Sequence, residues 1–362
     1  MSTFKFIPNP DFSRLRKALL RLGEPDCVPF YELFADPEIM DTVTKNTELV
    51  DPKYRSQVEA IHSRTVKFFY MLGYDYATLL VEPNLINNPQ TSFQSTTDTA
   101  ELSRGNRKWI NESQGPISSR ETYEKFPWPS PNSIDYSRIE KAGRNMPDGM
   151  MGIGMTGGVL EFATWLMGYQ TLSYGLLDHP DLIKDVFDRV GEVLVSIHTT
   201  MSQMDFIGAM SMGDDMGFRT STMISPEHLR RYVFPWQKKI VDAAHAQGKP
   251  FILHSCGKLD KIMDDLIDFL KIDAKHSYED TIMPVIEAKK RYGNRISILG
   301  GVDIDFLCRA TTDEVRKYTR NVLEQCAPGG GYCLGTGNSV ANYIKLENYL
   351  TMLDEGIKYN SR

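Results

Sequence analysis

Residues Pro250-Phe251-Ile252-Leu253-His254-Ser255-Cys256-Gly257 form an apolar run that ends in an imidazole, a hydroxyl and a thiol, followed by glycine. A short apolar run bounded by turn residues predicts a buried strand. Seven further runs have this character, and most of them are followed by a stretch with helical spacing. Strands that alternate with helices indicate a parallel sheet with the helices outside it. The eight runs are 27–31, 76–81, 151–155, 206–212, 250–253, 269–272, 296–299 and 331–334.

Eight such units in 362 residues predict an α/β fold, a closed (β/α)8 TIM barrel. An open, doubly wound sheet is the alternative. We expect one domain over residues 1–362, with an N-terminal helical segment at 1–74 and a polar insertion at 82–145. A long loop of this kind is often a lid or binding loop, although a mobile surface insertion fits equally well. The helices are expected at 11–22, 51–73, 159–166, 180–204, 226–247, 259–269, 282–291, 312–325 and 345–357.

The composition limits the classes of partner. The chain is 41% hydrophobic and 24% charged with a net charge of −6, which is typical of a soluble globular protein and argues against nucleic acid binding. Five cysteines, an odd and sparse set, predict free or metal-bound thiols in a reducing compartment. No stretch has the length of a secretory signal or a membrane span. We therefore expect a cytoplasmic protein with no nucleic acid and no membrane partner.

In such a barrel, active sites gather at the carboxyl ends of the strands. His254 and Cys256 lie two positions apart and would project from the same face, which makes half of a tetrahedral zinc site. A third ligand must come from elsewhere, and Cys333 in the last run is the best placed by type and position. Cys27, in the neighbouring first run, is the alternative. A core histidine beside a buried thiol is the simpler reading of the pair.

Other polar side chains end up at the same mouth of the predicted barrel. Asp215, after run 206–212, suits a general base or polar anchor, or else a cap for the following turn. We expect it to act with His254 and Cys256 in catalysis. Substrate contacts are expected from four residues near strand ends, although His276 could equally be structural. These four are His276, Asp303, Tyr332 and Asn338.

A series of motifs over about 140 residues resembles the uroporphyrinogen decarboxylase superfamily, and the resemblance implies a (β/α)8 barrel. Members that decarboxylate uroporphyrinogen carry an arginine-rich motif after the first strand, which suits a substrate with eight carboxylates. Here residues 30–36 are acidic and contain no arginine, so a porphyrinogen substrate is not expected. The motifs are Gly213-Asp214-Asp215, Ser225-Pro226-Glu227, His254-Ser255-Cys256-Gly257, Leu299-Gly300-Gly301-Val302-Asp303, Gly330-Gly331-Tyr332, Gly335-Thr336-Gly337-Asn338 and Glu347-Asn348-Tyr349.

The chain is more similar to the corrinoid-dependent methyltransferases of that superfamily. In the coenzyme M type, zinc is bound through His-x-Cys, which His254 and Cys256 match, and through a late cysteine. That cysteine often follows a Pro-Gly pair, where this chain has Gly337-Asn338. The resemblance therefore implies Zn²⁺ with Cys333 or a carboxylate such as Asp215 as third ligand. It also implies a cobalamin (corrinoid) carried by a partner protein.

The function expected from this resemblance is transfer of a methyl group from a small O-methyl substrate, with a methoxyaromatic as a guess, to the Co(I) corrinoid of a carrier protein. One alternative is a methylcobalamin-dependent thiol methyltransferase of the coenzyme M type. An alternative of another class is a zinc-free decarboxylase-like lyase or ligand-binding barrel. The oligomeric state stays open, with a homodimer among the options.

Overall fold

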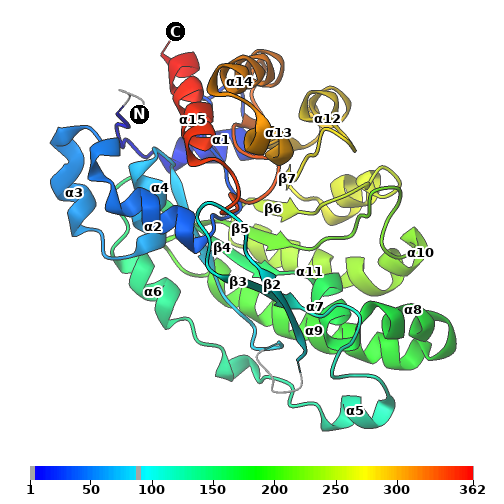
Figure 1. Cartoon of the computed structure of the whole chain (residues 1–362). Helices are drawn as coiled ribbons and strands as arrows, with labels where there is room; N and C mark the ends of the chain where they lie inside the picture. The colour runs from blue at the N-terminus through cyan, green and yellow to red at the C-terminus, as the bar shows by residue number, and fades with distance from the viewer. Residues whose placement is uncertain (1–4, 87–90, 362) are drawn as a thin grey trace.

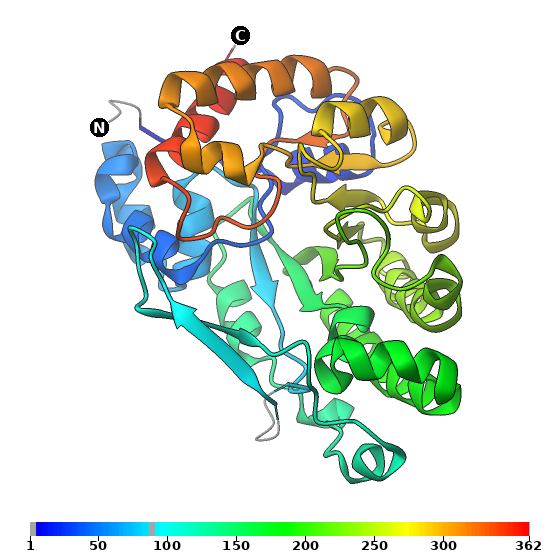
Figure 2. The ribbon, with the colours of Figure 1, turned by 45° about the vertical axis from the view of Figure 1, so that its right-hand side comes forward.

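The computed structural model describes residues 5–86 and 91–361. Its main sheet has seven parallel strands in the order β1-β4-β5-β6-β7-β8-β9, and the sheet curls so that helices cover its outer face (Figures 1 and 2). Each strand therefore pairs with the next strand of this sheet along the chain, as the alternating pattern predicted. The strands are β1 (Tyr76–Leu80), β4 (Met151–Gly157), β5 (Ile207–Gly213), β6 (Phe251–His254), β7 (Ala274–His276), β8 (Ser297–Leu299) and β9 (Tyr332–Cys333).

The segment around Phe30 closes the barrel between β9 and β1. On the β9 side, the amide of Tyr31 donates to the Leu334 carbonyl at 2.8 Å, and Phe30 bridges Leu334 in parallel. On the β1 side the contacts use side chains, because the Tyr76 hydroxyl binds both the amide and the carbonyl of Glu32. The predicted (β/α)8 barrel is thus confirmed, with its first strand reduced to a single bridge.

Helices fill the outer layer in the order expected. After β4 come α7 and α8, and the 23-residue helix α9 then runs back toward β5 (Figure 1). After β5 the chain passes through a π-helical turn, η4, before α11. The outer helices are α7 (Val159–Met167), α8 (Tyr169–Asp178), α9 (Pro180–Ser202), α10 (Pro226–His228), η4 (Leu229–Val233), α11 (Phe234–His245), α12 (Val285–Tyr292), α13 (Ile304–Arg309), α14 (Thr312–Cys326) and α15 (Leu346–Asn360).

The N-terminal segment is helical, but the expected single helix over 51–73 is wrong. The chain breaks at Ile61, which adopts an extended conformation, and Ser63 then caps a new helix by accepting a hydrogen bond from the Val66 amide. Serine favours this N-cap position over the interior of a helix. The elements are α1 (Phe12–Leu19), α2 (Pro37–Lys45), η1 (Thr47–Leu49), η2 (Pro52–Tyr54), α3 (Arg55–Ala60) and α4 (Arg64–Met71).

The strand expected at 269–272 is also wrong. Residues Asp265–Leu270 form the helical turn η5, and Lys271 ends it in a left-handed conformation with φ of 62°. The true strand, β7, begins at Ala274. A short apolar run cannot be told from a buried helical turn by its periodicity. The shift matters because it places Lys275 and His276 inside the sheet, next to β6.

The 82–145 insertion carries its own elements, and residues 87–90 within it lie outside the described part. Its antiparallel hairpin lies against the loop that follows β9, where the Asn342 amide side chain donates to Asp98 at 2.6 Å and Arg107 donates to Asp36 at 3.2 Å. Whether this insertion closes over a ligand stays a prediction. Its elements are β2 (Phe93–Thr97), β3 (Asn106–Ile110), α5 (Arg120–Lys125), η3 (Pro131–Ser133) and α6 (Ser137–Arg144).

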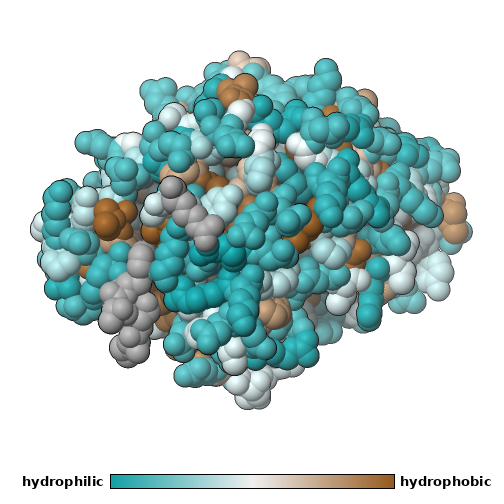
Figure 3. All heavy atoms as spheres, turned by 90° about the horizontal axis from the view of Figure 1, so that it is seen from above, coloured by the Kyte–Doolittle hydropathy of each residue, from teal (hydrophilic) through white to brown (hydrophobic). Residues whose placement is uncertain are grey.

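The surface seen from above in Figure 3 is mainly hydrophilic, with hydrophobic side chains scattered over it. Single exposed apolar residues of this kind are ordinary on a protein surface. Within residues 5–86 and 91–361, no helix combines the length and apolar character that crossing a membrane requires.

Candidate metal centre

A pair of buried histidines forms the base of the site. His254 ends β6 and pairs in register with His276, which ends β7. Their Nδ1 atoms lie 2.8 Å apart, and His276 Nε2 lies 2.9 Å from the Thr336 carbonyl oxygen. A carbonyl can only accept, so His276 Nε2 carries the hydrogen and its Nδ1 is an acceptor. His254 Nδ1 therefore donates to it, and His254 Nε2 is left with a free lone pair.

Burial keeps both rings neutral. It lowers the pKa of His254 to about 3, and the positive charge of Lys275 acts in the same direction. Burial also lowers the pKa of His276, and His254 adds to that effect. A neutral imidazole whose second nitrogen is held by a hydrogen bond is the usual state of a metal-ligating histidine.

The free lone pair of His254 faces a thiol and a carboxylate. Cys256 Sγ lies 3.4 Å from His254 Nε2, and Asp215 Oδ1 lies 3.7 Å from the same nitrogen. One oxygen of Asp215 also accepts a hydrogen bond from the Cys256 amide at 2.8 Å, which holds the carboxylate in place. These three donor atoms lie within 4.8 Å of one another and form the one such group found within the described residues. We call this group the Cys256 cluster.

The two neighbouring aspartates, Asp214 and Asp215, have different roles. Asp214 is fully buried and accepts hydrogen bonds from the amides of Leu160 and Glu161, in the first turn of α7, and from Gln237. It therefore anchors α7 to the end of β5. Asp214 thus has the anchoring role that the sequence allowed, whereas Asp215 turns toward the cluster, and its role in catalysis stays a prediction.

The surroundings of Cys256 disfavour a free thiolate and favour one that binds a cation. Burial raises the pKa of the thiol, and the charge of Asp215 raises it further. The Asn338 side chain donates to Sγ at 3.2 Å, and the Ser277 hydroxyl lies 3.7 Å away. A divalent ion at this point would balance the negative charges of Asp215 and the thiolate.

The residues present fit zinc. Two ligands at zinc–ligand distances of about 2.0–2.3 Å in tetrahedral geometry lie roughly 3.3–3.7 Å apart. The separations of His254 Nε2 from Cys256 Sγ, 3.4 Å, and from Asp215 Oδ1, 3.7 Å, are of this size. Sulfur, imidazole nitrogen and carboxylate oxygen also form a donor set that suits this borderline-soft ion.

Cys333, expected as the third ligand, is not brought to the cluster. It is fully buried in β9, where it pairs with Leu299. Burial raises the pKa of its thiol, and its charged neighbours are Asp75 and Lys289 rather than the residues of the cluster. The carboxylate that the resemblance allowed as an alternative, Asp215, lies beside His254 and Cys256 instead.

Of the four residues expected to contact substrate, two line a large pocket beside the cluster. This pocket has a volume of about 1200 Å³, and Cys256, Asn338 and Asp303 all line it. Asp303 also caps α13 by accepting from the Phe306 amide at 3.0 Å. Tyr332 is buried and donates to the Gly300 carbonyl at 2.9 Å, and His276 lies behind His254.

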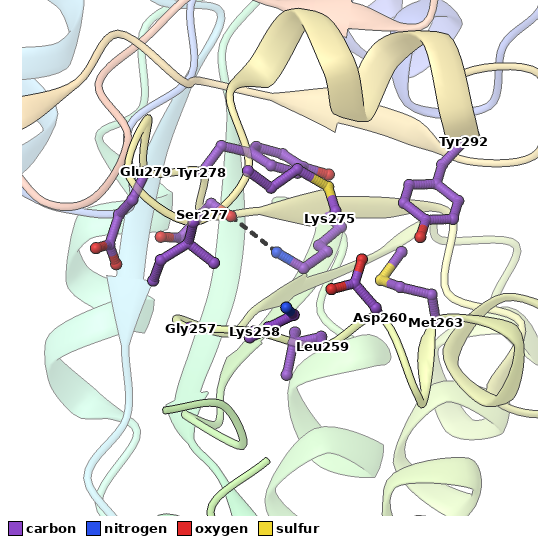
Figure 4. Close-up of a pocket in the computed structure, with 12 residues that line it drawn as sticks. Gly257, Lys258, Leu259, Asp260, Met263, Lys275, Ser277, Tyr278, Glu279 and Tyr292 are labelled. Atoms are coloured by element: carbon purple, nitrogen blue, oxygen red, sulfur yellow. Dashed lines mark hydrogen bonds between the residues drawn. The ribbon is translucent and has the colours of Figure 1, made fainter. Parts of the chain in front are cut away.

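A buried lysine lies next to the cluster and was missed from the sequence. Lys275 Nζ donates to the carbonyl of Ser277 at 2.8 Å (Figure 4), and to the carbonyl of Ser255 at 3.2 Å. It lines a small cavity of about 20 Å³, and burial lowers its pKa to about 8. The misplaced strand hid it, because an expected strand at 269–272 leaves residue 275 outside the sheet.

A family model described as uroporphyrinogen decarboxylase (URO-D) matches residues 114–359. Two curated sequences, both described as methylcobamide:CoM methyltransferase MtaA, are 24% identical over 212 residues. One is from Methanosarcina barkeri (strain Fusaro / DSM 804) and the other from Methanosarcina barkeri. The matched region is 58% of this chain and 57% of each relative, so the chain spans little more than half the length of these relatives.

The fold has a counterpart among solved structures. A methyltransferase from Methanosarcina mazei superposes with a TM-score of 0.70 at 18% identity, and the superposition covers 96% of this chain and 98% of that one. At this identity the likeness supports the barrel fold alone.

Proposed function

The chain belongs to the uroporphyrinogen decarboxylase family, and on that premise we propose that it is a zinc-dependent methyltransferase. It would move a methyl group from a small O-methyl compound to the Co(I) corrinoid of a partner protein. The observation that carries the proposal is the Cys256 cluster, whose sulfur lies in the wall of a pocket of about 1200 Å³. The relatives described as methylcobamide:CoM methyltransferases support the corrinoid assignment.

In this proposal His254, Cys256 and Asp215 hold the metal, and a zinc ion bound there supplies Lewis acidity toward an ether oxygen. His276 keeps the lone pair of His254 Nε2 directed at the centre. The Asn338 side chain donates to the Cys256 sulfur, and Asn338 also lines the pocket. It can therefore align a substrate against the cluster. A corrinoid presented by the partner protein would accept the methyl group as the methyl–oxygen bond breaks, and the oxygen, released as an alkoxide or phenoxide, would take a proton from water.

The rim of the pocket suits the approach of a second protein that presents the corrinoid. Phe218 and Tyr343 line the pocket and expose 60% and 50% of their surface. Aromatic side chains exposed at such an opening are common in interfaces. We therefore propose that the carrier protein covers this rim while the methyl group moves.

The charge of the pocket favours a neutral methyl ether over an anionic thiol. Five acidic residues and two arginines line it. Arg309 pairs with Asp305, so the excess charge is negative. Coenzyme M carries a sulfonate, which such a pocket repels. Thiol methylation of that type is accordingly our second candidate. The acidic lining residues are Glu279, Asp280, Asp303, Asp305 and Glu314.

One assay tests both direction and substrate. The purified protein is mixed with Co(I) cobalamin and separate methyl donors, among them methoxyaromatics, methanol and methylamines, and the absorbance of methylcobalamin is followed. We expect product with a methoxy compound. A protein that methylates coenzyme M from methylcobalamin, and forms no methylcobalamin from any ether, would support the second candidate. Full activity in protein shown to be free of zinc would refute both.

A further inference from the structure

A fully buried glutamate, Glu32, lies at the far end of the hydrogen-bond chain that supports the Cys256 cluster. Its side chain binds Thr336 twice. Oε1 accepts from the Thr336 amide at 2.8 Å, and Oε2 lies 2.5 Å from the Thr336 hydroxyl. From the sequence, Glu32 served only to argue against a polyanionic substrate. The structure places it in the barrel instead, with none of its surface exposed.

Thr336 connects Glu32 to both sides of the cluster. Its carbonyl accepts from His276 Nε2 at 2.9 Å, which sets the tautomers of His276 and His254. Its hydroxyl also lies 2.7 Å from the carbonyl of Asn338, whose side chain donates to the Cys256 sulfur. Fixing Thr336 thus fixes both the nitrogen ligand and the group beside the sulfur ligand.

Counting hydrogens favours a protonated Glu32. The Thr336 hydroxyl has one hydrogen, but it lies within hydrogen-bond distance of two oxygens, Glu32 Oε2 and the Asn338 carbonyl. If Glu32 were ionised, this single hydrogen would have to be shared between the two oxygens, and neither short contact would have a donor of its own. If Glu32 is protonated, its Oε2 donates to the Thr336 hydroxyl, which in turn donates to the Asn338 carbonyl, and every contact is satisfied.

The environment agrees with a neutral carboxyl group. Burial raises the pKa of Glu32 to about 8, and the only opposing contributions are its hydrogen bonds with Thr336. The titratable groups that interact with it are phenols, which are themselves buried and neutral: Tyr31, Tyr74, Tyr76, Tyr332 and Tyr349. A carboxyl group without a cation nearby in a low-dielectric interior stays protonated.

We propose that Glu32 is a positioning residue, held in its protonated form, which acts through Thr336 to orient the ligands of the Cys256 cluster. The proposal rests on the metal centre assigned under the proposed function. Because Glu32 is neutral, it orients the ligands without adding charge to the centre. The net charge there is then set by Asp215 and Cys256 with the cation of Lys275 nearby.

The test compares Glu32→Gln with Glu32→Ala by titrating the full-length protein with Co²⁺ and recording affinity and visible absorption. Glutamine can donate to the hydroxyl and accept from the amide, as a protonated carboxyl does. We expect Glu32→Gln to keep the wild-type spectrum and an affinity within about threefold, and Glu32→Ala to lose roughly 10- to 100-fold, as outer-shell substitutions do. Asp75→Asn, which removes a different buried carboxyl group, is the control and should leave the spectrum unchanged.

Two results would overturn the proposal. An unchanged spectrum and affinity in Glu32→Ala would remove any positioning role, and equal impairment of Glu32→Gln and Glu32→Ala would show that the carboxyl group is ionised. If Glu32→Ala does not fold, Thr336→Val, which removes the linking hydroxyl, should show the loss in its place, and an unimpaired Thr336→Val would count against the proposal.

A measurement without metal separates this proposal from the proposed function. Long-range ¹⁵N–¹H spectra of histidine-labelled apoprotein report each ring tautomer, and we expect His276 to carry its hydrogen on Nε2 and His254 on Nδ1. Thr336→Val should mix these tautomers. If wild type shows them fixed but binds no Co²⁺, the proposed function fails and the role of Glu32 stands. If Thr336→Val keeps them fixed, the role of Glu32 fails.

Discussion

Two thiols on the same barrel, the half-buried Cys256 and the fully buried Cys333, have different surroundings. Cys256 lies just past the end of β6. Its sulfur is 3.4 Å from His254 Nε2, and its backbone amide donates to the carboxylate of Asp215. Cys333 lies within β9, fully buried, with Asp75 and Lys289 as its charged neighbours. Burial raises the pKa of both thiols. Hydrogen-bonded donor atoms at a strand end, rather than burial or a raised thiol pKa, therefore distinguish the candidate metal site from a packed core cysteine.

The largest expected difference between the two regions is in zinc content. Cys256→Ala removes the only sulfur of the cluster, so we expect zinc to fall from about one ion per chain to background. Cys333→Ala leaves the cluster intact and creates a small cavity, which costs about 1–2 kcal/mol of stability. Elemental analysis of protein purified without a nickel column measures the first effect, and urea unfolding measures the second. Loss of zinc in Cys333→Ala would break the distinction.

The next largest effect is expected at the second histidine. His276→Phe deprives His254 Nδ1 of its acceptor, so zinc affinity should fall roughly 10- to 100-fold. His198→Phe is the matched control, because His198 is equally buried but binds Thr156 at 2.8 Å. Competition with a metal-binding dye measures both. Equal loss of affinity in the two variants would mean that a general loss of packing is responsible.

Two glycines, Gly300 and Gly329, test how closely the backbone must approach His276 and Thr336. Gly300 has φ of 73°, and a Cβ built there would lie 2.2 Å from the Thr336 carbonyl and 2.8 Å from His276 Nε2. Gly329, before β9, has φ of 81° with open space around it. Gly329→Ala should cost about 1–2 kcal/mol from conformation alone. Gly300→Ala should cost about 2–4 kcal/mol and weaken zinc binding as well.

If both alanine variants unfold at the same urea concentration with zinc affinity unchanged, the close contact between His276 and Thr336 has no structural importance. This outcome would also weaken the tautomer argument, since that contact is where the hydrogen of His276 is assigned.

A further effect on stability concerns pH. Burial raises the pKa of Glu32 from 4.5 to about 8, so the folded state binds a proton that the unfolded state releases between these values. The stability of wild type relative to Glu32→Gln should therefore decline as pH rises from about 4.5 to about 8, by at most about 1.4 kcal/mol per unit. Urea unfolding of both proteins across this range measures the slope.

Asp75, close to Cys333, sharpens the comparison. Burial raises its pKa to about 7, although the positive charge of Arg14, 2.8 Å away, acts in the opposite direction. The stability of wild type relative to Asp75→Asn should therefore also decline as pH rises, without any change in zinc binding. If wild type instead became more stable with rising pH, relative to Glu32→Gln or to Asp75→Asn, the carboxyl group in question would be ionised in the folded protein.

Much of the fold could be predicted because apolar runs and helical spacing are local signals. The run at 250–253 is β6, and the barrel follows from its repetition. The run at 269–272 failed because a buried helical turn has the same apolar pattern, and the left-handed Lys271 that ends it leaves no clear trace in the sequence. The first strand was located, but the sequence did not show that it forms only one bridge. On its other side the Tyr76 side chain replaces strand pairing, and Tyr76 lies 46 positions from Phe30 along the chain.

The site was predictable only where its residues are neighbours in sequence. His254 and Cys256 lie on one strand end, so their spacing shows that they meet. Asp215 was a candidate, but the sequence does not show how it differs from Asp214. The two differ because the first turn of α7 donates hydrogen bonds to Asp214 and not to Asp215. Glu32 and Thr336 meet across 304 residues, and a single sequence carries no signal for such a contact.

In the proposed zinc site, one sulfur from Cys256 binds the ion together with His254 and Asp215. X-ray absorption spectroscopy at the zinc edge of the wild-type protein measures these ligands. We expect a single sulfur scatterer at about 2.3 Å together with nitrogen and oxygen neighbours at about 2.0–2.2 Å. Two sulfur neighbours would bring Cys333 or another thiol into the site and contradict the assignment of Asp215, and a zinc spectrum without sulfur would contradict the site altogether.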